Sequence, residues 1–181
     1  GTDHLLKNAY GKCGHFVYVS TDFVFDGSKG LYSEDDPRSP VNYYGETKRL
    51  AEDIVGQGNI PWSIARTCLV YGNTIVGTRS NIISWVKENL ETGKNIKVVS
   101  DQLRTPTYIK DLVDGILLLL DKQAKGTFHL SGKDVLTPFE MACATADHFK
   151  LDRSMLEKVD ATVFSQPAQR PLRTGFDISK A

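Results

Sequence analysis

The sequence predicts an α/β fold with a doubly wound, mainly parallel sheet. Short runs rich in β-branched and aromatic residues alternate with segments of helical periodicity. Turn-forming Gly, Pro, Asn and Asp residues separate these segments, and an apolar content of 40% is typical of a chain with a substantial core. Strands that alternate with helices favour a parallel sheet, because each helix carries the chain back to the edge where the next strand begins.

The first half of the chain contains two such units. The run HFVYVS indicates a strand, and the following polar loop leads into a helix whose apolar face is marked by Leu50, Ala51 and Ile54. The expected elements are a helix over 3–10, a strand over 15–20, a loop over 21–40, a helix over 42–55 and a strand over 62–67.

The second half continues the alternation. Thr137, Pro138 and Glu140 have the order of a capping box with proline at the first helical position, which sets the start of the last helix. The expected elements are a helix over 81–90, a strand over 96–100, a helix over 109–121, a strand over 127–131 and a helix over 137–149. The helix over 109–121 is expected to face the core with Leu112, Val113, Ile116, Leu117, Leu119 and Leu120. Residues 160–181 are expected to form loops and short strands beside the sheet.

Charge and composition exclude several classes of function. Lys plus Arg and Asp plus Glu number 22 each, so no basic field favours nucleic acid or an anionic membrane as a partner. The apolar runs are too short to span a bilayer, and the first residues lack a signal-peptide layout, which predicts a cytoplasmic location. Three scattered cysteines and four histidines without ligand spacing predict reduced core thiols and no metal site.

The spacing Tyr44-Gly45-Glu46-Thr47-Lys48 carries the most chemical information. Residues four apart on a helix share a face, so the tyrosine and the lysine are expected to be neighbours. A free phenol has a pKa of about 10, and a nearby ammonium group lowers that pKa because it favours the ionised form. Tyr44 is therefore a candidate general acid or base. The alternative is an exposed amphipathic turn, because the pattern also arises by chance.

The residues Ser20, Thr21 and Asp22 end the first predicted strand. Open α/β sheets bind ligands at the carboxyl edge of their strands. We expect the Thr21 hydroxyl to bond a substrate carbonyl while Tyr44 delivers a proton, and Lys48 to bond the ribose of a nicotinamide cofactor that supplies hydride. The alternative for Thr21 and Asp22 is an ordinary turn that closes the strand.

Two stretches, VSTDFVFDG over 19–27 and PVNYYGETK over 40–48, resemble the dTDP-4-dehydrorhamnose reductase family of the extended short-chain dehydrogenases. Later segments agree with this resemblance, namely RTCLVYG over 66–72, GTFHLSG over 126–132 and Arg170-Pro171. The resemblance implies NADPH- or NADH-dependent reduction of the 4-keto group of dTDP-4-dehydrorhamnose, which gives dTDP-L-rhamnose.

The resemblance also implies roles for single residues. Tyr44 is expected to be the proton donor and Thr21 to assist it, while Ser20, Tyr44 and Lys48 bind the cofactor. The nucleotide-sugar substrate is expected to contact Thr21, Asp22, Leu69 and Arg170. A homodimer is compatible with this resemblance.

Two departures from the family pattern keep other functions open. Phe23 stands where the family usually has tyrosine, and Leu69 where it often has a sugar-contacting tryptophan. Leu69 and two further segments also resemble the regulatory beta subunit of methionine adenosyltransferase, which implies a nucleotide-binding role without turnover. A nucleotide-sugar epimerase or dehydratase would retain the same Thr21, Tyr44 and Lys48 set.

A third departure concerns the cofactor. No G-x-x-G-x-x-G or G-x-G-x-x-G follows an N-terminal strand, and Gly56-Gln57-Gly58 follows a helix, as a helix-ending turn does. We therefore expect on the order of 80 to 100 further residues in front of the chain. Residues 1–125 are predicted to be the C-terminal part of a Rossmann-like NAD(P)-binding domain, and residues 126–181 a small substrate-side α+β portion.

Overall fold

Three parallel strands form the central sheet, in the order β1-β2-β6. β1 (Phe16–Thr21) pairs with β2 (Trp62–Thr67) in a register that places Thr21 beside Thr67. On its other side β2 pairs with β6 (Gly126–His129). The predicted parallel α/β architecture is confirmed. The computed structural model describes residues 1–73, 80–165 and 167–181.

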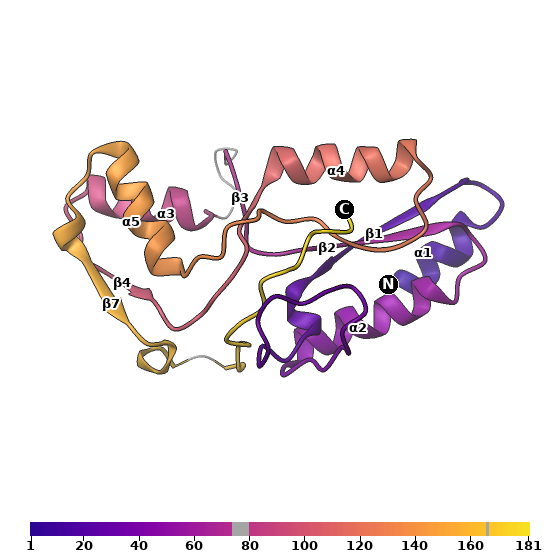
Figure 1. Ribbon diagram of the computed structural model, residues 1–181, viewed down its shortest axis with the longest axis horizontal. Helices are drawn as coiled ribbons and strands as arrows, with labels where there is room; N and C mark the ends of the chain where they lie inside the picture. Colours follow the sequence, from indigo (N-terminus) through magenta and orange to yellow (C-terminus); the bar gives the residue numbers. More distant parts are fainter. Residues whose placement is uncertain (74–79, 166) are drawn as a thin grey trace.

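Helices cover both faces of this sheet (Figure 1). α1 (Thr2–Ala9) and α2 (Tyr43–Gly56) lie on one face, and α4 (Ile109–Asp121) lies on the other. A strand with helices on both sides loses its contact with solvent, which explains why β2 is buried from Ser63 to Thr67.

A second, smaller unit lies at one end of the molecule (Figure 1). α3 (Ile82–Glu91) and α5 (Pro138–Phe149) pack against a two-stranded parallel sheet made of β4 (Ile96–Val99) and β7 (Leu156–Val159). Its core contains Val86, Leu90, Ile96, Val98, Ala142, Cys143, Ala146 and Leu156. The predicted strand over 96–100 therefore exists, but it belongs to this smaller sheet, because it pairs with β7. The sequence pattern does not reveal β7, since its segment is short and carries two charged residues.

The remaining elements are short. β3 (Val70–Tyr71) and β5 (Thr107–Tyr108) pair in parallel, and the predicted capping box of α5 is confirmed, with Thr137 and Glu140 each bonding the other's main-chain N–H. Three 3-10 turns are η1 (Asp22–Val24), η2 (Arg153–Met155) and η3 (Ala161–Val163).

The prediction that all six apolar residues of α4 face the core is wrong for three of them. Leu112 and Leu119 are buried, whereas Val113, Leu117 and Leu120 are 45%, 57% and 40% exposed. The apolar residues of this helix cover more of its surface than the sheet contacts, and charged residues such as Asp111 and Asp114 occupy the rest.

The buried face of α2 also differs from the prediction. Leu50 and Ile54 are exposed, and the buried positions include Ala51, Glu52 and Val55. A carboxylate thus occupies a place that the apolar pattern would assign to a hydrophobic side chain.

Cys68 and Cys143 are buried, as expected of core thiols, but Cys13 is exposed in the turn that follows α1. None of the helices within the described residues combines the length and the apolar character needed to cross a bilayer.

Candidate functional site

The carboxyl end of β1 runs directly into η1, and this junction carries the first predicted site residues. The Thr21 hydroxyl donates to Asp22 Oδ1 over 3.0 Å and accepts from the Phe23 main-chain N–H over 3.3 Å. Both bonds fix the turn that ends the strand. The Thr21 side chain therefore lies at the sheet edge where parallel α/β proteins bind ligands.

The first turn of α2 packs directly on η1. Asn42 caps the helix by accepting from the Gly45 N–H over 2.8 Å. A Cβ atom on Gly45 would lie 2.1 Å from the Phe23 carbonyl oxygen, so only glycine permits this approach. The packing brings the Tyr44 ring to a centroid distance of 5.8 Å from the Phe23 ring. Thr21 and Tyr44, far apart in the sequence, thus lie on adjoining elements.

Lys48 lies one helical turn after Tyr44 and reaches β1. Its Nζ donates to the Val19 carbonyl oxygen over 3.0 Å and lies 4.9 Å from the centroid of the Tyr18 ring. Burial lowers the pKa of Lys48, and the Glu52 carboxylate opposes that shift. Tyr44 is 51% exposed on the first turn of the same helix.

Asp22 is buried and faces protein groups. Its carboxylate accepts from the Thr174 hydroxyl, and Arg104 Nε lies 3.7 Å from it. Burial raises the pKa of Asp22, and the Arg104 charge and the Thr174 hydrogen bond act in the opposite direction. The residue predicted to touch a sugar therefore also joins η1 to the C-terminal segment.

Arg104 anchors that segment beside α2. Its guanidinium donates to the Pro171 carbonyl oxygen over 2.7 Å, and Asn42 Nδ2 donates to the Gln169 carbonyl oxygen over 2.8 Å. Arg170 lies between these two anchors and is exposed. The structure thus brings Arg170 to the beginning of the helix that carries Tyr44.

Ser20 and Leu69 occupy less expected environments. Ser20 is buried, and its hydroxyl lies near the Glu52 carboxylate without forming a hydrogen bond within the described part of the chain. Leu69 joins β2 to β3 with a φ of 40°, a left-handed conformation that is uncommon for residues other than glycine. Such conformations often occur at functional sites.

A buried charge network beneath Lys48 was not predicted. Glu52 accepts from Arg66 Nε over 2.9 Å and from Arg66 Nη2 over 2.8 Å, and Arg38 Nη1 lies 3.0 Å away. Burial alone would raise the pKa of Glu52, but the arginines outweigh it and hold that pKa below its usual range. Only the fold brings Arg66 of β2 to Glu52, so no spacing along the sequence reveals the pair.

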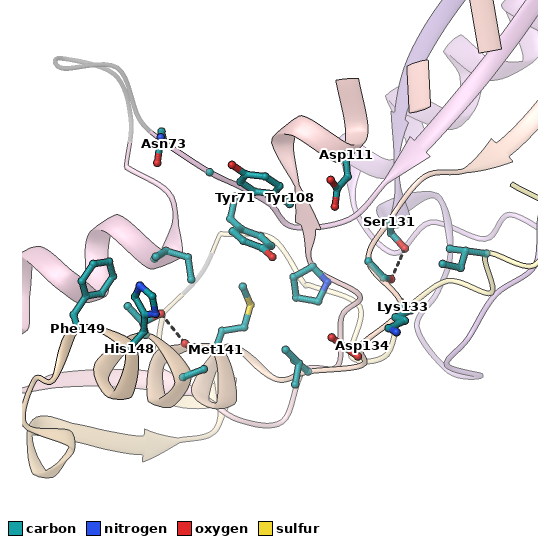
Figure 2. A pocket seen from close by; sticks show the side chains of 18 residues that line it. Tyr71, Asn73, Tyr108, Asp111, Ser131, Lys133, Asp134, Met141, His148 and Phe149 are labelled. Carbon is teal, nitrogen blue, oxygen red and sulfur yellow. Dashed lines mark hydrogen bonds between the residues drawn. The ribbon is translucent and has the colours of Figure 1, made fainter. Parts of the chain in front are cut away.

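A cavity of about 720 Å³ lies apart from these residues, between α4 and α5 (Figure 2). Figure 2 shows Tyr71 and Tyr108 across from Met141 and His148. This cavity is not lined by Thr21, Tyr44 or Lys48. The predicted proton-transfer groups do not face this cavity.

The residues at the carboxyl edge fit one part of a nicotinamide cofactor. An ammonium group, an exposed phenol and a hydroxyl are donors suited to a ribose, and Lys48, Tyr44 and Ser20 supply them, although the Ser20 hydroxyl is buried beside Glu52. The sequence contains no glycine-rich loop that could hold the pyrophosphate.

Known proteins resemble this chain over nearly its whole length. The family model described as RmlD substrate binding domain matches residues 1–181. The methionine adenosyltransferase 2 subunit beta of Rattus norvegicus is 36% identical to this chain over an alignment of 183 positions. The alignment covers 98% of this chain and 54% of that protein.

Two solved structures are similar in fold. A dTDP-4-dehydrorhamnose reductase from Clostridium acetobutylicum ATCC 824 has a TM-score of 0.89 and 30% identity, over 98% of this chain and 61% of that one. A dTDP-4-dehydrorhamnose reductase from Bacillus anthracis str. Ames, solved in complex with NADP, has a TM-score of 0.83 and 30% identity, over 90% of this chain and 57% of that one. This chain spans little more than half the length of the curated relative. Because the family model matches it from end to end, the chain belongs to the RmlD substrate binding domain family.

Proposed function

We propose that the full-length protein reduces the 4-keto group of a nucleotide-linked deoxysugar with NADPH or NADH, converting dTDP-4-dehydrorhamnose to dTDP-L-rhamnose. One observation carries the proposal: Tyr44 is exposed on the first turn of α2, which packs on η1 directly after β1, and Lys48 lies one turn further along the same helix. The similarity to two dTDP-4-dehydrorhamnose reductases supports the choice of substrate.

The proposed chemistry needs one hydride and one proton. The cofactor, when bound, supplies the hydride to C4 of the sugar. The Tyr44 hydroxyl gives its proton to the 4-keto oxygen, so that the carbonyl becomes an alcohol and a phenolate remains. The positive charge of Lys48 would stabilise that phenolate, and the N–H groups that do not donate to the Val19 carbonyl oxygen would be available to hold the cofactor ribose.

The other site residues would orient the substrate. Thr21 donates to the sugar after its hydroxyl turns away from Asp22, and Asp22 lies beside it. Leu69 supplies an apolar wall at the end of β2. The exposed guanidinium of Arg170 matches a diphosphate, because its planar N–H groups pair with phosphate oxygens.

A second candidate function is a nucleotide-binding subunit without turnover. The observation in its favour is the 36% identity to the methionine adenosyltransferase 2 subunit beta over 98% of this chain. This candidate predicts tight binding of a nucleotide and no oxidation of a reduced cofactor.

The two candidates separate in one assay. The full-length protein is mixed with dTDP-4-dehydrorhamnose and NADPH, and the loss of nicotinamide absorbance is followed. We expect turnover that falls by about 10²- to 10⁴-fold in Tyr44→Phe, the usual contribution of a general acid. Tyr43→Phe is the matched control, because Tyr43 is 84% exposed on the same turn. Binding without any cofactor oxidation would refute the reductase and favour the subunit.

A further inference from the structure

The Lys48 ammonium group lies against an aromatic ring. Lys48 Nζ is 4.9 Å from the centroid of Tyr18, within the distance of about 6 Å at which a cation is attracted by a ring face. The same Nζ donates to the Val19 carbonyl oxygen over 3.0 Å. One charged group is thus held by a ring and a carbonyl from consecutive residues of β1.

The usual partner of a helical lysine would be a carboxylate one turn away, and Glu52 occupies that position. Both Glu52 oxygens are instead taken by Arg66, at 2.9 and 2.8 Å. That pair is buried, with side-chain exposures of 3% for Arg66 and 1% for Glu52. Because Arg66 engages Glu52, the lysine can rest on β1 rather than fold back along α2.

Tyr18 reaches the lysine because of its place in β1. It pairs in register with Ile64 of β2, and α2 packs across both strands. Burial raises the pKa of Tyr18, and Glu52 and Tyr44 add to that shift. The Tyr18 phenol therefore stays neutral at about pH 7. A neutral ring that has both Tyr44 and Lys48 as neighbours can hold the cation without competing for the proton.

We propose that Tyr18 is a positioning residue for Lys48, whose ammonium group rests on the Tyr18 ring. This inference rests on the proposed function for its catalytic meaning, but the position of the lysine does not. The ring face and the Val19 carbonyl oxygen restrict where the ammonium group can lie, which lowers the entropy lost when its other N–H groups bond a ligand.

The first test measures the position of the lysine in the 181-residue chain. The Lys48 ε-CH₂ proton signals, assigned with Lys48→Arg, should be shifted upfield by the ring relative to those of exposed lysines. Tyr18→Phe keeps the ring and should keep this shift, whereas Tyr18→Leu should abolish it. Unshifted Lys48 signals in the unsubstituted chain would overturn the proposal, even if the Leu variant failed to fold.

The second test measures the consequence in the full-length protein. Tyr18→Leu should raise the KM for NADPH by about two- to fivefold, the range expected for one exposed cation–π contact, and should also lower kcat, because Lys48 stabilises the Tyr44 phenolate. Tyr18→Phe should restore the original KM. Equal KM values for the Leu and Phe variants, in a protein that turns over, would refute Tyr18 as a positioning residue and leave the reductase standing. A ring shift that responds as expected, in a protein that oxidises no NADPH, would refute the reductase and leave the lysine position standing.

Discussion

His129 should make the stability of the chain fall as the pH drops below the ordinary histidine range. The side chain is fully buried in β6, with its ring stacked on Phe176 at a centroid distance of 4.0 Å. Burial lowers the pKa of His129 from 6.5 to about 4. The unfolded chain therefore takes up a proton as the pH falls through 6.5, while the folded chain does so only near pH 4.

The size of the effect follows from the two pKa values. Each pH unit between them corresponds to about 1.36 kcal/mol. Protonation of His129 should thus leave the free energy of unfolding unchanged well above pH 6.5. It should lower that free energy by about 2 kcal/mol at about pH 5, and by about 3 kcal/mol near pH 4.

Denaturant unfolding at several pH values between about 7 and 4 measures this loss. His129→Gln, which cannot take up a proton, should remove most of the pH dependence between about 7 and 5, above the range in which carboxylates such as Glu52 take up protons. His148→Gln is the control, because His148 is exposed and should leave the dependence intact. Equal losses of free energy on acidification in the unsubstituted chain and in His129→Gln would contradict a lowered pKa of the buried His129.

Two further substitutions test the packing that shapes the site. Gly45→Ala places a Cβ 2.1 Å from the Phe23 carbonyl oxygen and should destabilise the chain by roughly 1 to 3 kcal/mol in denaturant unfolding, whereas Gly56→Ala, whose Cβ meets nothing closer than 3.8 Å, should be neutral or stabilising. Arg104→Met leaves the buried Asp22 carboxylate without its cation, so it should lower the free energy of unfolding by about 3 to 5 kcal/mol and speed amide hydrogen exchange over 171–176. The control Arg173→Met, at an exposed residue, should change neither quantity. Equal effects of the two substitutions would contradict the anchoring role of Arg104.

Much of the fold follows from local sequence patterns. The helix over 109–121 and the strand over 62–67 have the boundaries that periodicity predicts, and the capping box sets the start of α5. Local patterns fail where a distant partner decides the outcome. β7 exists because β4 pairs with it, and α4 exposes an apolar side because the neighbouring sheet covers only part of it.

The candidate site shows the same division. The positions of Tyr44 and Lys48 follow from helical spacing, and Thr21 follows from the end of a strand. Glu52 and Arg66 could not be found in this way, because each looks like a solvent-exposed charge until the fold pairs them. Tyr18 has the pattern of an ordinary strand residue, and only the packing of α2 on β1 gives it a cation to hold.

Hydride transfer is the central claim for the full-length protein, and isotope transfer tests it most directly. NADPH carrying deuterium at the transferred position is incubated with dTDP-4-dehydrorhamnose, and the sugar product is analysed by mass spectrometry and NMR. We predict dTDP-L-rhamnose with deuterium at C4, and a large loss of this product in Tyr44→Phe but not in Tyr43→Phe. Recovery of unlabelled sugar from a protein that binds both ligands, or unchanged deuterium transfer in Tyr44→Phe, would contradict it.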